Sequence, residues 1–153
     1  MTLNPPSIPP DGRHRYPIRV YYEDTDAGGV VYHATYLRFA ERARTEALRD
    51  LGIPHAALLA RHGVMFMVRH LEVDYERAAR LDDRLTVATE VLAVGGATVR
   101  LRQTIRREDG ACAILAVRLA CVQREGNKPG RIPPQWRERL LAMRDRRETV
   151  TGA

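Results

Sequence analysis

The spacing of apolar residues switches along the chain from a period of two to a helical period and back. YPIRVYYED, from Tyr16, is rich in β-branched and aromatic residues and predicts a first strand that runs into an acidic turn. From residue 34 the apolar positions recur every three or four residues, which predicts one long helix. Gly52 and Pro54 predict its end, because glycine forms a left-handed C-cap and proline blocks continuation.

Four strand-like segments follow a short helical piece, PHAALLARHG. They are VMFMVRHLEVDYERA, DDRLTVATEVLAV, ATVRLRQTIRRE and ACAILAVRLACVQRE. Gly95-Gly96 and Asp109-Gly110 separate the last three as short hairpin loops that require positive φ, so these strands form a predicted meander. Apart from Arg118, residues 111–122 are apolar at both odd and even positions, and so on both sides of a strand. This predicts a central strand with both faces covered. TVRLRQTIRR alternates instead, which predicts one wet face.

This order predicts an α+β fold in which one curved antiparallel sheet wraps the long helix. A chain of 153 residues holds a single core of ordinary size. We divide it into a flexible proline-rich tail (1–15), one domain that ends with a helix from about Pro134 (16–147), and a second flexible tail (148–153). No apolar run reaches the roughly 18 residues of a membrane span, and the first fifteen residues do not form a signal peptide. We therefore expect a cytoplasmic protein.

Composition changes this picture little. Hydrophobic residues make up 44% and charged residues 29%, as in globular proteins. Cys112 and Cys121 lie on one predicted strand, about 30 Å apart and on opposite faces. They cannot form a disulfide with each other, and one such pair is no zinc site. Two buried thiols suit a reducing compartment.

The net charge of +6 concentrates in RIPPQWRERLLAMRDRR near the C-terminus. Such a segment suits the phosphates of a small cofactor, an acidic carrier protein, an anionic membrane surface or RNA. It also serves simply to keep a protein soluble. Charge alone does not choose among these.

Candidate chemistry lies in EDTDAGGVVYH, residues 23–33. A helix that begins between His33 and Thr35 leaves its first N–H groups without helical partners, at an electropositive end. Gly28 and Gly29 allow a close approach and leave room for a substrate carbonyl, and Asp26 can lie opposite its carbon. A carboxylate with aimed N–H groups suits acyl transfer.

The same residues allow plainer interpretations. Glu23, Asp24 and Asp26 are also ordinary turn formers and partners of a helix dipole. A metal site is not expected, because the rest of a calcium-loop pattern is missing. The glycine pair lacks the spacing and the Lys-Ser/Thr of a phosphate loop.

The run RVYYEDTDAGGVVYHATYLRFAERARTEAL, with YERAARLDDRL further on, resembles the hotdog-fold acyl-CoA thioesterases of the 4-hydroxybenzoyl-CoA thioesterase family. Within that family it is similar to the bacterial Tol-Pal-associated group, over about Arg19 to Pro133. The resemblance implies that Asp26 is the catalytic carboxylate, as nucleophile or general base, and that an N–H near His33 polarises the thioester oxygen. The His33 imidazole then orients substrate or water, or makes a structural hydrogen bond.

The resemblance also implies a homodimer joined through sheet edges, or a dimer of such dimers, with acyl-CoA in the subunit interface. An acyl group on acyl carrier protein is a second possible substrate. No metal or redox cofactor is expected. The substrate-binding candidates are Gly28, Gly29, Tyr32, Tyr36, Met65, Phe66, Met67, Lys128 and Arg131.

Several of these candidates have a second interpretation. Tyr36 and the residues 65–67 suit a hydrophobic core equally well. Lys128 and Arg131 are either contacts to coenzyme A phosphates or solvated charges. Ala78 stands where the family usually has proline, which leaves the placement of Arg80 open.

Two other functions remain as rivals. A hotdog hydratase would carry a longer signature that this chain lacks. A non-catalytic acyl-CoA, lipid or RNA-binding module would use the basic surface. We expect no nucleic acid and at most peripheral membrane contact.

Overall fold

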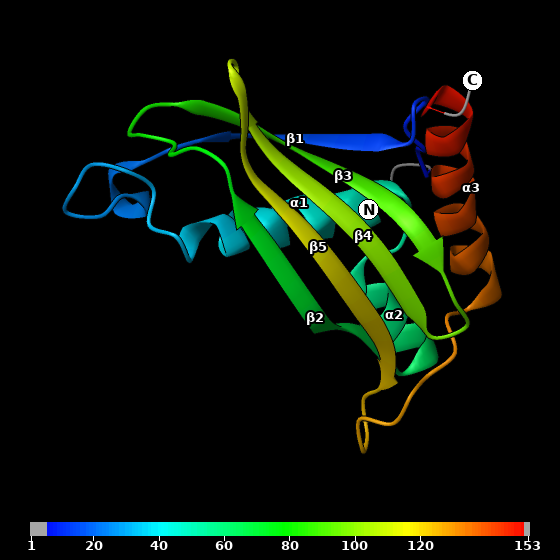
Figure 1. Ribbon diagram of the computed structural model, residues 1–153. Coiled ribbons are helices and arrows are strands. Elements are labelled where there is room, and N and C mark those ends of the chain that lie inside the picture. The colour runs from blue at the N-terminus through cyan, green and yellow to red at the C-terminus, as the bar shows by residue number, and fades with distance from the viewer. Residues whose placement is uncertain (1–5, 152–153) are drawn as a thin grey trace.

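The computed structural model describes residues 6–151 and consists of one curved antiparallel sheet with three helices (Figure 1). The sheet has five strands in the order β1-β3-β4-β5-β2. The strands are β1 (Arg13–Arg19), β2 (Val64–Tyr75), β3 (Arg84–Val94), β4 (Thr98–Arg107) and β5 (Gly110–Gln123). The helices are α1 (Thr35–Asp50), α2 (His55–His62) and α3 (Pro134–Thr151), with a 3-10 turn, η1 (Tyr22–Asp24).

Helix α1 packs on the inner face of the sheet, as its apolar stripe predicted. Tyr36, Phe39, Ala43 and Leu48 are buried in one core cluster with inward-facing residues of the strands. The helix ends at Asp50 with Leu51 as its C-cap, and Gly52 follows in the left-handed conformation expected after a helix (φ 81°). The predicted α+β fold, a curved antiparallel sheet around one long helix, is confirmed.

The predicted meander is also confirmed, since β3, β4 and β5 pair in chain order. The two remaining strands do not follow that order. β1 pairs with β3, and β2 pairs with β5, so both lie at the edges of the sheet. β2 therefore has one edge that no strand within residues 6–151 covers.

One polar side chain is enclosed in this core. Gln103 of β4 is 0% exposed. Its amide group donates hydrogen bonds to the backbone oxygen of Ala40 (2.8 Å) and to the hydroxyl of Thr89 (3.0 Å). Its oxygen accepts a long hydrogen bond from Arg44 (3.5 Å). A buried amide is costly unless it is bonded in this way, so these contacts fix α1 against β3 and β4.

Two predictions about strands were wrong. The first strand runs from Arg13 to Arg19, because the Tyr21 N–H then bonds to the Asp24 carboxylate (2.8 Å) and closes η1. Strand β5 lies inside the sheet with β4 at the centre, and its outer face is open, with Ala116 and Arg118 exposed. Its outward residues are mostly too small to require a covering layer.

Of the predictions about hairpin glycines, one is confirmed and one is wrong. Gly110 has positive φ (147°), as a hairpin glycine was expected to have. Gly95 and Gly96 do not have positive φ, so that prediction was wrong. The Gly95 N–H instead bonds to the Thr98 carbonyl (2.8 Å), and a Cβ on Gly95 would lie 2.7 Å from the Thr98 hydroxyl. Glycine is needed at position 95 for space, not for its φ angle.

The basic C-terminal segment forms α3, which packs against β3. Trp136, Leu140 and Met143 form a buried stripe on this helix. Its arginines bind carbonyl groups elsewhere in the chain: Arg139 donates to Gly52 after α1 (3.0 Å), and Arg147 donates to Val91 within β3 (3.2 Å). Much of the basic segment is thus used within the chain.

Regular structure is present in parts of both predicted tails. β1 begins at Arg13, three residues before the expected start, and the Ser7 N–H bonds to the Asp50 carbonyl (2.7 Å). Helix α3 continues to Thr151, past the expected end at residue 147. Residues 1–5 and 152–153 of the predicted tails lie outside the described residues.

Two further observations concern the whole described range. No helix within residues 6–151 combines the length and apolar character needed to cross a membrane. Cys112 and Cys121 both lie on β5, as predicted, and both are buried free thiols.

Candidate active site

The acidic loop folds back on itself as a small hairpin. The Asp26 N–H bonds to the Val30 carbonyl (2.9 Å), the Tyr32 N–H bonds to the Asp24 carbonyl (3.0 Å), and Thr25 pairs with Val31. Gly29 at the tip has positive φ (78°), which few other residues adopt without strain. In Figure 1 this loop projects beyond the sheet, at the left.

The Asp26 carboxylate is exposed and is oriented by its own loop. Its Oδ1 accepts hydrogen bonds from the N–H groups of Gly28 (2.8 Å) and Val30 (3.4 Å). A Cβ on Gly28 would lie 3.3 Å from the same oxygen. The N–H groups of Gly28 and Val30 therefore hold one carboxylate oxygen, and the other oxygen has no hydrogen-bond partner among the described residues.

The start of α1 leaves the His33 N–H without an acceptor among the described residues. Its N-cap position is Ala34, which has no capping side chain. The Thr35 N–H bonds to the Tyr32 carbonyl (2.8 Å), but among residues 6–151 no acceptor binds the His33 N–H. The His33 ring is exposed and lies 4.4 Å from the ring of Tyr32. No hydrogen bond joins His33 to Asp26 within the described part of the chain.

Residues of the YERAARLDDRL segment, 75–85, hold this loop in place. The Tyr75 hydroxyl donates to the His33 carbonyl (2.8 Å), and the Val31 N–H bonds to the Ala79 carbonyl (2.8 Å). The Ala79 N–H in turn donates to the Tyr36 hydroxyl (3.0 Å), which is buried. Burial raises the pKa of the Tyr36 hydroxyl, so it remains a neutral hydrogen-bonding group.

Tyr75 and Ala79 were not predicted as site residues. The only signal for them was that YERAARLDDRL accompanies the acidic loop in the resemblance. The open question about Arg80 is answered here, since its backbone pairs with Val30 although residue 78 is not proline.

A groove of about 260 Å³ runs between α1 and β2. Leu48, Phe66, Val68 and Leu119 form its apolar wall; Glu41, Arg44, Thr45 and His55 form its polar wall. Burial lowers the pKa of Arg44, and burial with the charges of Arg44 and Arg49 lowers the pKa of His55. His55 is therefore neutral at neutral pH. The sequence indicated only Phe66 of this set.

The three β2 candidates lie on different sides of the strand. Phe66 is buried and faces the His55 ring, with ring centroids 6.4 Å apart. Met65 is half-buried, whereas Met67 is 44% exposed. Only Phe66 lines the groove between α1 and β2 within one chain.

Lys128 and Arg131 are exposed in the loop that joins β5 to α3. This loop, orange in Figure 1, lies at a different end of the molecule from the acidic loop. The structure therefore does not bring these two side chains to Asp26 of the same chain.

A single curved sheet around one long helix, with a carboxylate loop at the start of that helix, defines the hotdog class of thioester hydrolases. A model of the thioesterase-like superfamily matches residues 20–140, and the chain belongs to this family. The expected family and the expected class of enzyme, a thioester hydrolase, are confirmed.

Individual relatives agree with this assignment. The chain is 48% identical over 125 residues to the acyl-CoA thioesterase YbgC of Haemophilus influenzae, which covers 82% of this chain and 92% of that one. It is 46% identical over 120 residues to the acyl-CoA thioester hydrolase YbgC of Escherichia coli, with 78% and 89% covered. A probable thioesterase from Bartonella henselae has a similar structure, with a TM-score of 0.74, 38% identity, and 79% and 99% covered.

Proposed function

We propose that this protein hydrolyses acyl-CoA, with Asp26 as the catalytic carboxylate and the His33 N–H as the group that polarises the carbonyl. The observation that carries the proposal is the geometry of residues 24–35. An exposed carboxylate, fixed by two backbone N–H groups, shares a short hairpin with the start of α1, where the His33 N–H has no acceptor among residues 6–151. The names of the two YbgC relatives support acyl-CoA as the substrate.

The chemistry requires only these groups. As a nucleophile, Asp26 would attack the thioester carbon, release the thiolate of coenzyme A, and form an anhydride that water then hydrolyses. As a general base, it would take a proton from water that attacks the same carbon and pass it to the leaving sulfur. Both routes develop negative charge on the carbonyl oxygen, which the His33 N–H and the helix dipole stabilise. A thioester is already activated, so neither route needs a metal or redox cofactor.

The groove between α1 and β2 is our candidate for the acyl group. The start of α1 lies at one end of this helix–strand contact, where Tyr75 bonds to His33. Glu41 and Arg44 lie about 12 to 16 Å further along the helix from His33, at 1.5 Å per residue. Phe66 and Val68 supply the apolar surface that an acyl chain requires.

A second copy of the chain would complete this site. The outer edge of β2 has no partner strand in the described part of the chain, and Met67 and Val68 of this strand are 44% and 45% exposed. Pairing of two β2 edges would satisfy the free backbone groups and cover these side chains. It would also bring the partner's loops toward each groove, which is how Lys128 and Arg131 could reach a bound coenzyme. We propose the dimer on this basis, and a dimer of dimers as its extension.

The decisive test is thiol release from acyl-CoAs of short, long and aromatic type by wild type and Asp26→Asn. We expect Asp26→Asn to lower kcat by a factor of about 10³ or more, because the amide neither attacks nor accepts a proton at this step. Glu23→Gln is the matched control: it removes one exposed charge from the same loop and should keep normal turnover. Near-normal hydrolysis by Asp26→Asn would refute the assignment.

The same screen separates the rival functions. Tight binding of an acyl-CoA without hydrolysis would indicate a non-catalytic binding module. Faster hydrolysis of an acyl group on acyl carrier protein than of the same acyl-CoA would identify the carrier-bound substrate. An RNA site on the basic surface would lose affinity steeply with added salt.

A further inference from the structure

The outer face of the sheet, opposite α1, carries a row of basic side chains across three strands. Arg100 of β4 lies directly opposite Arg118 of β5, and Arg118 lies directly opposite His70 of β2. All three are exposed. Side chains at such positions share one face with Cβ atoms about 5 Å apart, and like charges there destabilise the sheet.

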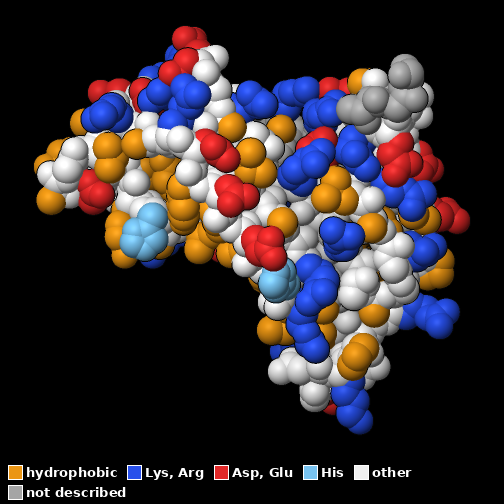
Figure 2. All heavy atoms as spheres, in the orientation of Figure 1, with side chains coloured by type: hydrophobic (Ala, Val, Ile, Leu, Met, Phe, Trp, Pro, Cys, Tyr) orange, Lys and Arg blue, Asp and Glu red, His pale blue; other side chains and the backbone are white. Residues whose placement is uncertain are grey.

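The row borders a hollow of about 360 Å³. The register shifts at residue 69 in β2 and at residue 92 in β3, and such bulges bend a strand and turn its side chains. Ala116 lies between the two sides of the hollow and contributes only a methyl group. The lining residues are His70, Glu72, Leu92, Arg100, Leu101, Ala116, Val117 and Arg118. Figure 2 views this side of the molecule, where Lys and Arg side chains gather over the sheet.

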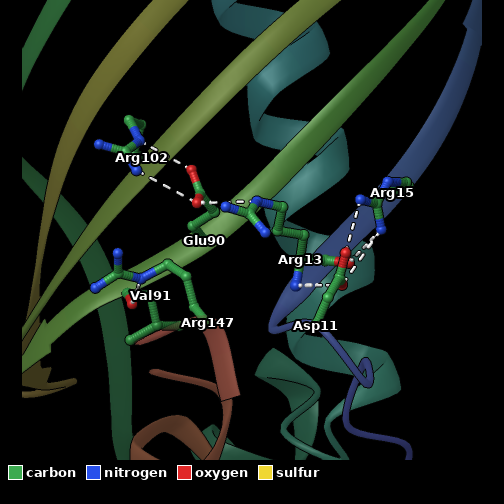
Figure 3. Close-up of polar contacts among 7 residues, drawn as sticks. All are labelled: Asp11, Arg13, Arg15, Glu90, Val91, Arg102 and Arg147. Carbon is green, nitrogen blue, oxygen red and sulfur yellow. Dashed lines mark hydrogen bonds and ion pairs between the residues drawn. The ribbon is translucent and has the colours of Figure 1, made fainter. Parts of the chain in front are cut away.

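Neighbouring arginines on the sheet are balanced by acids. Arg13 and Arg102 both contact the Glu90 carboxylate, at 3.2 and 2.8 Å, and Arg15 contacts Asp11 at 2.8 Å (Figure 3). These contacts join β1, β3 and β4 into one network of paired charges. Arg13, Arg15 and Arg102 are therefore each paired with a carboxylate.

Arg100 and Arg118 lack such compensation. Within residues 6–151, neither guanidinium has a carboxylate oxygen within 4.0 Å. Glu72 is the acid in the hollow, and its Oε1 contacts His70 Nε2 at 3.0 Å. Two neighbouring guanidinium groups without a carboxylate partner among the described residues thus line one hollow, and Leu92 is also part of its lining.

We propose that this hollow is a binding site for a phosphate monoester group, held between Arg100 and Arg118. Guanidinium groups bind phosphate oxygens through paired hydrogen bonds, and a dianion between them replaces their repulsion with attraction. The side chain of Leu92 leaves room for the organic part of the ligand. The same phosphate chemistry occurs in the nucleotide part of coenzyme A, in the headgroup of an anionic lipid and in free phosphate. The site stands independently of the proposed hydrolytic function.

The test compares thermal unfolding in sodium phosphate with unfolding in sodium chloride of equal ionic strength. Wild type should gain several degrees in Tm from saturating phosphate, because a ligand that binds only the folded state stabilises it. Arg118→Gln and Arg100→Gln should gain clearly less than wild type at the same phosphate concentration, because their phosphate affinity should be at least about tenfold weaker. Without phosphate, their Tm should equal or exceed that of wild type, since the repulsion is removed.

Arg106→Gln is the matched control. Arg106 is exposed on β4 and does not line the hollow, so its loss removes the same charge elsewhere on the strand. This variant should keep the full gain from phosphate. Equal gains in all four proteins, or no gain over chloride in wild type, would overturn the proposal.

Three further probes identify the source of the phosphate. Greater stabilisation by coenzyme A than by its 3′-dephospho form, lost in Arg118→Gln, assigns the site to the nucleotide. Sedimentation with vesicles of phosphatidylcholine and phosphatidic acid, but not with phosphatidylcholine alone, assigns it to a lipid headgroup. A response to inorganic phosphate alone assigns it to the free ion.

Discussion

At the scale of single residues, the two glycines of the acidic loop have separate roles. Gly29 is needed for its backbone conformation, with φ of 78° and open space where a Cβ would lie. Gly28 is needed for space, because its Cβ would press on the Asp26 carboxylate at 3.3 Å. Gly29 therefore contributes to the stability of the loop, and Gly28 contributes to the position of its carboxylate.

Alanine at each position should separate these roles. Gly29→Ala should lower the free energy of unfolding by about 1 kcal/mol, because an L-residue is strained at this φ, and leave kcat of the folded enzyme near normal. Gly28→Ala should lower kcat about tenfold with little effect on stability, because small displacements of a catalytic group are costly. Urea unfolding and thiol-release kinetics on both variants measure the two effects. If Gly28→Ala changed only stability, the close contact with Asp26 would have no catalytic meaning.

The buried thiol of Cys121 should make the stability of the protein depend on pH in the alkaline range. Burial raises the pKa of Cys121 to about 11 from an ordinary value of 9.0. The folded state therefore holds this proton more tightly than the unfolded state, so the contribution is complete below pH 9 and is lost as the pH rises through about 11.

The expected result is a fall in the free energy of unfolding between about pH 9 and pH 11 that is shallower in Cys121→Ala. Urea unfolding at several pH values measures it, and the difference between the two proteins removes the contributions of other groups. Parallel curves for wild type and variant would show that Cys121 ionises equally in both states.

At the scale of elements, a carboxylate in the middle of the sheet joins three strands. Glu90 of β3 is 5% exposed and contacts Arg13 of β1 and Arg102 of β4, which lie directly opposite it (Figure 3). Fixed charges of this kind define strand register, because a shift by one residue would leave the carboxylate buried and unpaired.

Glu90→Gln should therefore destabilise the protein by about 2 kcal/mol. Removing one partner of a fully buried ion pair costs about 3–5 kcal/mol, and the cost is lower here because Arg102 remains partly hydrated. The change appears as a lower urea midpoint. Glu108→Gln, an exposed acid near the β4–β5 turn, is the control and should leave the midpoint unchanged. Equal midpoints for the two variants would show that the pair contributes no stability.

At the scale of the whole molecule, the free edge of β2 is the feature that most needs a partner. It is twelve residues long and carries exposed Met67 and Val68. Long apolar edges are prone to pair with other chains, so a specific dimer is the expected outcome.

Met67→Asp should convert such a dimer to monomer, because the pairing would bury an uncompensated charge near its copy in the other subunit. Light scattering after gel filtration gives the mass directly. Val150→Asp, an equally polar change at an exposed position near the end of α3, should leave the mass unaltered. A wild type that is monomeric at micromolar concentration would contradict the proposed interface.

Much of this fold was accessible from local pattern. The apolar stripe of α1 and the alternation of β4 predicted which side chains are buried, since periodicity depends only on backbone geometry. The acidic loop and the start of α1 were likewise indicated by residue types. The pattern did not predict that Gln103 lies in the core, because a lone polar residue on an inward face becomes acceptable only when distant groups bond to it.

The sequence by itself determined the elements, the class of fold and the loop that carries Asp26, because turns, caps and periodicity act between residues close along the chain. Only the tertiary structure decided that β2 pairs with β5 and leaves an edge open. It also decided that Tyr75 and Ala79 anchor the acidic loop, and that Arg100 lies opposite Arg118 on the neighbouring strand. These depend on contacts between segments remote in sequence, where strand order and register are set by the packing of the entire sheet on α1.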